Sequence, residues 1–219
     1  MQKLLIFFLK SVNIYSKGVI FIICFLSNRL ADFLCEKRII EEEQKPVYKY
    51  GIEIIISSLI GFLLIFTIGI ISGMFIKACI FYIIFVYTRT CTGGYHADSY
   101  LKCNVVLLVI YLCVLFFSEL MTSSYNIIIH LMVLIIYMSS ILGFAPITNI
   151  NKPMSVDEIK ENRKKCILIS VIWSILSLAL YFLSVRYAIV TALTLFSISM
   201  LLIIEKCRKE ENEYEEDSE

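Results

Sequence analysis

A polar segment between two long apolar runs carries the side chains best suited to chemistry. It reads Arg89-Thr-Cys-Thr-Gly-Gly-Tyr-His-Ala-Asp-Ser-Tyr-Leu-Lys-Cys103 and contains one of the two histidines and two of the eight cysteines. A cysteine thiolate is a strong nucleophile, and a nearby imidazole can take the thiol proton and later return it to a leaving amine. His96 and Cys103 are therefore a candidate catalytic pair.

The spacing of His96 and Cys103 sets a condition on this pairing. On one unbroken helix, seven residues make two turns, which separates the two side chains by about 10.5 Å along the axis. A nucleophile and its base need a hydrogen bond of about 3 Å. The backbone must therefore bend near His96. Gly93-Gly94 allows such a bend, because glycine accepts backbone angles that other residues avoid.

A helix is expected to begin just after the glycines. Asp98 and Ser99 are both candidate N-caps for a helix that continues through Leu101. Cys103 would then lie near the N-terminus of that helix, where the helix dipole favours a thiolate.

The sequence leaves alternatives open for Arg89 and for the whole segment. Arg89 either clamps a peptide carboxylate or a developing charge, or simply anchors the end of a helix. The segment itself could be a cytosolic loop that turns at its glycines, with a solvated His96 and an unreactive Cys103.

Composition places the chain in a membrane. Of its 219 residues, 59% are hydrophobic and 18% are charged, against roughly 45–50% and about 25% in soluble domains. The apolar residues gather in runs long enough to cross a bilayer. We predict an all-α, polytopic membrane protein with about six transmembrane helices. The expected spans are Gly51–Gly69, a shorter one ending near Thr88, Asn104–Met121, Ile127–Phe144, Cys166–Val185 and Tyr187–Ile204.

Three regions are expected along the chain. Residues 1–49 mix apolar and basic side chains, which is typical of amphipathic helices in the membrane interface followed by a charged linker. Helices packed on the end of the bundle are the alternative. Residues 50–205 form the six-span domain, with the active-site segment 89–103 and a polar cytosolic loop over 146–165. Residues 206–219 are acidic and are expected to be disordered.

The basic residues predict the orientation. All of the 20 lysines and arginines except Lys77 and Arg186 fall in segments that share one side when both termini are cytosolic. The positive-inside rule therefore favours cytosolic termini and places the 89–103 segment at the cytosolic face of a bacterial plasma membrane. Lys77 is expected to reach the outer interface with its long side chain.

Three other ionisable residues fall inside the expected spans, where such groups are costly and often functional. Glu53 either orients His96 or is solvated at a helix end. Glu119 and His130 either pair across the turn between their spans or are hydrated at the outer interface. If these groups line a path, the chain is a transporter or channel, although its halves show no evident repeat.

The same sequence argues against several classes of protein. The eight cysteines show no CxxC and no regular spacing, and no HExxH is present, so we expect neither a metal site nor another cofactor. No basic face with interleaved aromatic residues indicates a nucleic-acid partner.

The polar segment resembles the active-site region of the AgrB (accessory gene regulator protein B) family. Four residues fit the pattern Arg-x4-Gly-x-His-x6-Cys: Arg89, Gly94, His96 and Cys103. The turn at Ala145-Pro146, followed by Asn151-Lys-Pro153, also resembles the cytosolic loop of that family.

The resemblance implies a membrane cysteine endopeptidase of Gram-positive quorum sensing. Such an enzyme removes the C-terminal tail of a small, amphipathic AgrD-like propeptide and promotes cyclisation to a thiolactone or lactone. The resemblance implies that Cys103 is the nucleophile and that His96 is the general base and acid. Arg89 and Gly94 would be supporting residues. A homodimer in the lipid bilayer is also implied.

Overall fold

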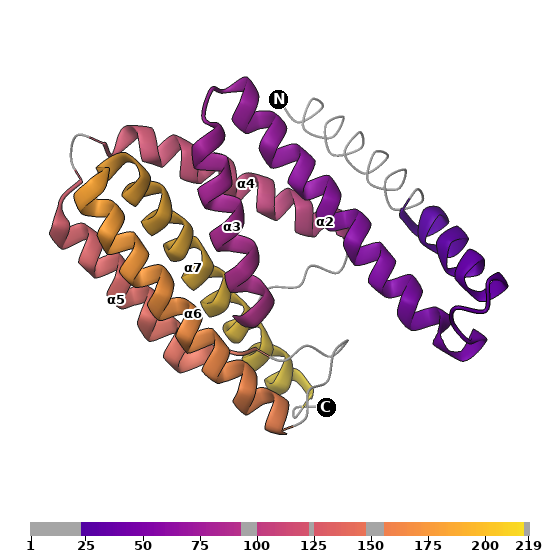
Figure 1. Ribbon diagram of the computed structural model, residues 1–219. Helices are drawn as coiled ribbons and strands as arrows, with labels where there is room; N and C mark the ends of the chain where they lie inside the picture. Colours follow the sequence, from indigo (N-terminus) through magenta and orange to yellow (C-terminus); the bar gives the residue numbers. More distant parts are fainter. Residues whose placement is uncertain (1–22, 93–99, 123–124, 148–155, 217–219) are drawn as a thin grey trace, which may run out of the picture. The chain divides into compact units, whose positions relative to one another are not determined.

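The computed structural model describes residues 23–92, 100–122, 125–147 and 156–216, all predominantly helical (Figure 1). A helix over residues 23–36 and a short 3-10 turn, η1 (Glu42–Gln44), precede six long helices. These are α2 (Lys45–Ile71), α3 (Phe75–Thr92), α4 (Tyr100–Leu120), α5 (Ile127–Phe144), α6 (Val156–Leu183) and α7 (Val185–Glu216). No β-strand occurs in these four stretches.

All six long helices are apolar enough to cross a bilayer. A helix is the natural spanning element because it satisfies its backbone hydrogen bonds internally. Large apolar side chains are exposed along these helices, as expected for surfaces that face lipid acyl chains. The prediction of an all-α, multi-pass membrane protein with six spans is therefore confirmed.

Several helices extend further than the sequence suggests, and α2, for example, begins at Lys45 and not at Gly51. Residues 156–165, expected within a loop, form the polar first part of α6. Residues 206–216, expected to be disordered, continue α7. Ion pairs one helical turn apart favour this continuation, since Arg208 lies 3.1 Å from Glu205 and Lys206 lies 3.2 Å from Glu210.

The chain divides into two compact units, and α2 and α4 contribute to both. The first unit comprises residues 1–64 and 97–108, and the second comprises 65–96 and 109–219.

In the first unit, the helix over residues 23–36 is tied to α2 by polar contacts. Ser27 Oγ donates to Glu53 Oε1 at 3.1 Å, and Lys45 Nζ lies 2.8 Å from Asp32 Oδ1. Another face of this helix exposes Phe25, Leu26, Leu30 and Phe33. Two cations accompany these aromatic rings, with Arg29 over Phe25 and Lys37 over Phe33. Such a mixture of aromatic and basic residues is typical of a helix at a membrane interface.

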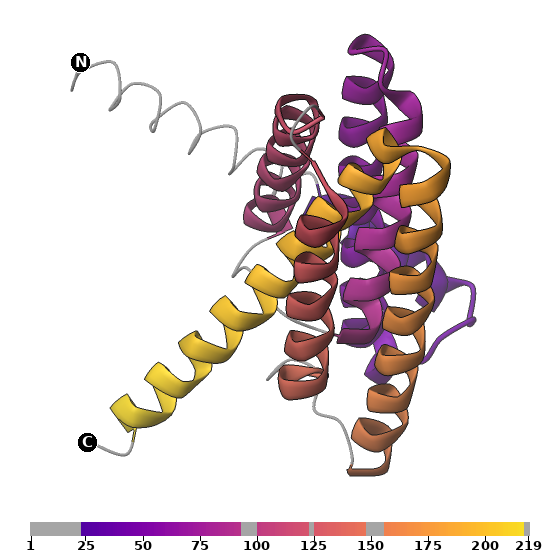
Figure 2. The same cartoon turned by 90° about the vertical axis from the view of Figure 1, so that its left-hand side faces the viewer.

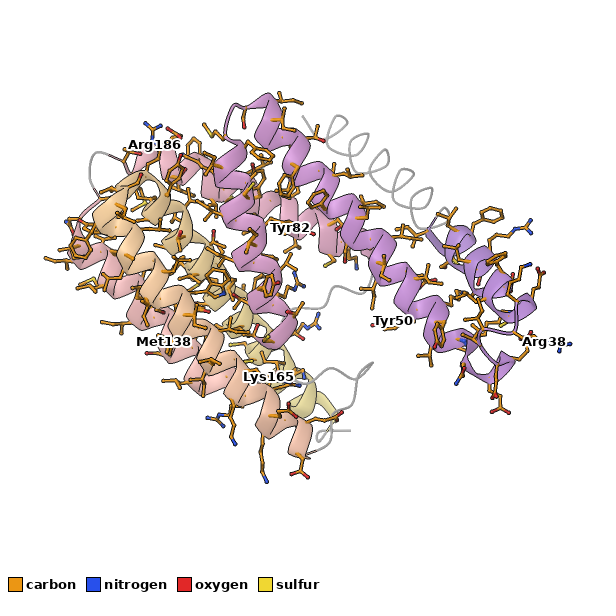
Figure 3. The ribbon with its side chains drawn as sticks, viewed as in Figure 1. Arg38, Tyr50, Tyr82, Met138, Lys165 and Arg186 are labelled. Atoms are coloured by element: carbon orange, nitrogen blue, oxygen red, sulfur yellow. The ribbon has the colours of Figure 1, made fainter. Side chains whose placement is uncertain are left out.

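The second unit is built around α7, which packs against α3, α5 and α6. Figure 2 shows α7, in yellow, running obliquely to α5 and α6. Its face toward the other helices is small and branched, with Ala188, Ile189, Val190 and Leu195 fully buried. Figure 3 shows Lys165 and Arg186 at opposite ends of the α6–α7 pair.

A tight turn joins α2 to α3 within the second unit. Gly73 adopts a positive φ of 67°, a conformation that glycine accepts without strain. The two helices meet closely beyond this turn, since a Cβ on Gly69 would lie 2.6 Å from the Cβ of Ala78. Small residues therefore allow the two backbones to approach.

Candidate active site

The last turn of α3 carries Arg89. Its side chain is partly buried, and its guanidinium lies 5.6 Å from the centroid of the Phe85 ring, within cation–π distance. A cation is favoured at this end of a helix because the C-terminal carbonyls give it a partial negative charge.

The end of α3 is fixed by two hydrogen bonds from other parts of the second unit. The Ile147 backbone N–H donates to the Thr92 carbonyl at 2.9 Å, and Cys166 Sγ donates to the Cys91 carbonyl at 2.8 Å. The last four carbonyls of a helix have no partner within the helix, so such contacts satisfy them. The point from which the chain continues toward residue 93 is thereby anchored.

Cys103 is the fourth residue of α4, which begins at Tyr100. The predicted placement of this cysteine near a helix N-terminus is confirmed. Its thiol is free and partly buried.

The residue after Cys103 is bonded into the first unit. Asn104 is 8% exposed, and its Nδ2 donates to the Ser57 carbonyl at 3.2 Å and to Ser57 Oγ at 3.1 Å. Gly61, one turn further along α2, has no side chain at the point where Asn104 and Leu107 pass. These contacts set the register of the first turns of α4 on α2.

Four predicted site residues lie outside the described stretches: Gly94, His96, Asp98 and Ser99. The hydrogen bond between His96 and Cys103 and the N-cap of α4 therefore stay predictions. Arg89 and Cys103, which are described, fall in different compact units.

Glu53 is not a solvated residue at a helix end. Its side chain is 14% exposed, and its Oε1 accepts the hydrogen bond from Ser27 Oγ and lies 4.0 Å from Lys49 Nζ. This polar environment stabilises a carboxylate in a mostly apolar helix. Its predicted role in orienting His96 remains untested.

Lys77 and Glu119 form an ion pair between α3 and α4 within the second unit. The Lys77 ammonium also donates to Ser118 Oγ at 3.0 Å, and its side chain is 6% exposed. The sequence suggests a lysine that extends to the outer interface, whereas the structure buries Lys77 against Glu119 on the neighbouring helix. Glu119 accordingly pairs with Lys77, not with His130.

His130 is completely buried, not hydrated as the sequence suggests. Its Nδ1 lies 2.9 Å from Tyr125 Oη and its Nε2 lies 3.3 Å from Ser177 Oγ. The Tyr181 ring packs against the imidazole, with centroids 5.2 Å apart. Both ring nitrogens therefore have hydrogen-bond partners inside the bundle.

Sequence reasoning did not single out Asn104, Ser57 or Cys166. The available signals were an asparagine directly after the candidate nucleophile and a Ser-xxx-Gly pair in the preceding span. Small residues at this spacing favour close helix packing in membranes. A lone cysteine at the start of an apolar run gives no comparable signal.

The six long helices define a multi-pass α-helical membrane protein. Its candidate nucleophile, Cys103, is a free cysteine in the first turn of α4. A family model described as "Accessory gene regulator B" matches residues 27–204. The chain belongs to this AgrB family, a peptidase family that processes quorum-sensing propeptides.

Similar individual proteins carry matching names. A "Putative AgrB-like protein" of Clostridium perfringens (strain SM101) is 25% identical over 166 residues, which cover 72% of this chain and 78% of the relative. A protein of the same name from Listeria monocytogenes serotype 4a is 24% identical over 142 residues, covering 64% and 69% respectively. No solved structure matches the chain.

Proposed function

We propose that this chain is a membrane cysteine endopeptidase that removes the C-terminal tail of a small AgrD-like propeptide and promotes its cyclisation. The observation that carries the proposal is the position of Cys103. Its thiol is free and partly buried in the first turn of α4, at the place that the family pattern gives to the nucleophile. Family membership supplies the substrate class.

The first chemical step is acyl transfer to the enzyme. His96 takes the proton of the Cys103 thiol, and the sulfur attacks the carbonyl carbon of the peptide bond that precedes the tail. The C–N bond breaks as the C–S bond forms, and His96 returns the proton to the departing amine. The propeptide core is then held as a thioester on Cys103.

The second step closes the ring. A cysteine or serine side chain of the bound peptide gives its proton to His96 and attacks the thioester carbonyl, and Cys103 leaves as a thiol. Exchange of one thioester for another is close to thermoneutral, so the activated bond survives if water is kept away. A site at a membrane boundary favours this outcome over hydrolysis. The reaction requires no metal or other cofactor.

Several features of the chain support a site at the cytosolic face. The distribution of basic residues favours cytosolic termini, which places the 89–103 segment on the side where a newly made propeptide resides. An amphipathic propeptide binds the inner leaflet and is concentrated there. The helix over residues 23–36 is a suitable docking element, since it exposes aromatic, aliphatic and basic side chains on one face. A homodimer, which the family suggests, belongs to the same proposal.

The residues that the structure describes give a transporter no specific support. Such a function would use Glu53, Glu119 and His130 along a path. Each of these side chains instead has a hydrogen-bond partner on a neighbouring element. Interhelical contacts of this kind stabilise membrane bundles.

Co-expression with the propeptide encoded beside the gene tests the enzymatic proposal. Mass spectrometry would measure cleavage by the wild type, Cys103→Ser and His96→Ala, at matched membrane levels. We expect both variants to lose cleavage. Cys207→Ser is the matched control, because Cys207 is exposed on α7, and it should retain activity. Cleavage by Cys103→Ser at the wild-type rate would overturn the proposal.

A further inference from the structure

We propose that Asn104 is a positioning residue for the Cys103 thiol, and that it acts by docking into a notch on α2 formed by Ser57 and Gly61. This inference rests on the proposed function, because it concerns the geometry of the nucleophile. All the residues involved belong to the first compact unit.

The notch consists of two small residues one helical turn apart. Ser57 and Gly61 lie on the same face of α2, since residues at i and i+4 are neighbours on a helix surface. A Cβ added to Gly61 would lie 2.9 Å from Asn104 Oδ1 and 3.0 Å from Leu107 Cδ2. Both distances are short, so a side chain at this position would push the ends of the Asn104 and Leu107 side chains out of their present positions.

The asparagine amide fills the notch with two hydrogen bonds. Its Nδ2 donates to both the hydroxyl and the backbone carbonyl of Ser57. The backbone acceptor matters, because it is fixed by the α2 helix and cannot change rotamer. In an apolar environment an unbonded amide is costly, so α4 resists rotation or sliding away from this register.

The register of Asn104 determines where the thiol points. Adjacent residues on a helix are about 100° apart around its axis. With Asn104 directed into the contact with α2, Cys103 lies on the flank of that contact, which agrees with its partial burial. Misplacement of a reacting group by about 1 Å can cost about a hundredfold in rate. A residue that fixes the helix register therefore acts on the turnover rate through Cys103.

The test combines steady-state cleavage of the propeptide with site-resolved alkylation. For each purified variant, kcat and KM would be measured, and iodoacetamide labelling of Cys103 would be followed against pH by peptide mass spectrometry. Asn104→Ala should lower kcat by about tenfold or more while KM changes less than about twofold, and it should alter the pH profile of Cys103 alkylation. Ser57→Ala should have a smaller effect, because its backbone carbonyl still accepts from Asn104.

Two comparisons make the result specific. Gly61→Ala should reproduce the loss in kcat, whereas Gly51→Ala, on the same helix with nothing within 4 Å of the added Cβ, should behave like the wild type. Ser57→Ala combined with Asn104→Ala should be no worse than Asn104→Ala alone, since the two residues share one interaction.

The inference and the proposed function fail in different ways. If Cys103→Ser is inactive but Asn104→Ala has wild-type kcat and an unchanged alkylation profile, the positioning role is wrong and the enzyme assignment stands. If Cys103→Ser still cleaves, the enzyme assignment is wrong, and the alkylation profile alone decides whether Asn104 positions the thiol. Should Asn104→Ala fail to fold, Gly61→Ala takes its place in the test, and a wild-type kcat with an unchanged alkylation profile in that variant overturns the inference.

Discussion

The thiol of Cys166 donates a hydrogen bond to the backbone carbonyl of Cys91, with Sγ and O 2.8 Å apart. This contact joins the beginning of the apolar part of α6 to the last turn of α3. Arg163, one turn earlier on α6, similarly donates to the Leu142 carbonyl near the end of α5 at 3.1 Å. The first three turns of α6 therefore supply donors to carbonyls at the C-terminal ends of two neighbouring helices.

Replacement of Cys166 should show how much its hydrogen bond to the Cys91 carbonyl contributes to stability. Cys166→Ala leaves the Cys91 carbonyl without its donor, and we expect a loss of about 1 kcal/mol in stability. Cys166→Ser keeps a donor and should lose less. Thermal unfolding in detergent would measure both.

Because Cys166 is 1% exposed, its wild-type thiol should also resist maleimide in the folded protein, while the exposed Cys207 reacts. Fast labelling of Cys166 would show that this contact is not maintained.

The ion pair between Lys77 and Glu119 predicts an asymmetric response to mutation. The side chains are 6% and 52% exposed, respectively. Glu119→Leu leaves a buried ammonium with only Ser118 as a partner from this cluster, and we expect a loss of about 3 kcal/mol. Lys77→Met leaves a carboxylate that water reaches, so its cost should be about 1 kcal/mol.

The double variant Lys77→Met with Glu119→Leu should recover most of the stability lost by Glu119→Leu, because no unpaired charge remains. Melting temperatures in detergent would rank the three variants. Equal losses for the two single variants would contradict the assigned burial of the lysine.

The His130 cluster should affect stability without affecting the chemistry. Tyr125→Phe removes the partner of Nδ1 and Ser177→Ala removes the partner of Nε2. Each should cost about 1 kcal/mol, because a buried ring nitrogen loses its hydrogen bond. Propeptide cleavage per folded molecule should stay at the wild-type level. If cleavage per folded molecule falls in either variant, His130 has a functional role as well as a structural one.

The fold was readily predictable because one physical property dominates it. Stretches that must remain in hydrocarbon need long apolar helices, and the number and approximate position of these helices are visible in the sequence. The polar start of α6 was missed because residues 156–165 are charged, and charge alone does not separate a solvated helix from a loop. Ion pairs within that segment, such as Lys165 with Glu161 at 2.8 Å, favour the helix.

The candidate site was only partly predictable. The position of Cys103 near a helix start follows from local residues, and α4 begins where expected. The partners of Lys77, His130 and Asn104 depend on which helix faces which, and at what register. Neighbouring residues in a single sequence do not show which helices pack together. A lysine in a buried ion pair and a hydrated lysine therefore cannot be distinguished from the sequence.

The orientation of the chain can be tested with its own cysteine. The prediction that both termini are cytosolic places Cys207, which is exposed near the basic part of α7, inside the cell. The turn between α2 and α3 should then lie outside, and Ser72 in that turn is exposed. A membrane-impermeant maleimide should label Ser72→Cys in intact cells and label Cys207 only after permeabilisation. The alkylated peptides, separated by mass spectrometry, distinguish these two sites from the other cysteines. Labelling of Cys207 in intact cells would invert the orientation and place Cys103 on the side away from newly made propeptide, where the proposed reaction could not begin.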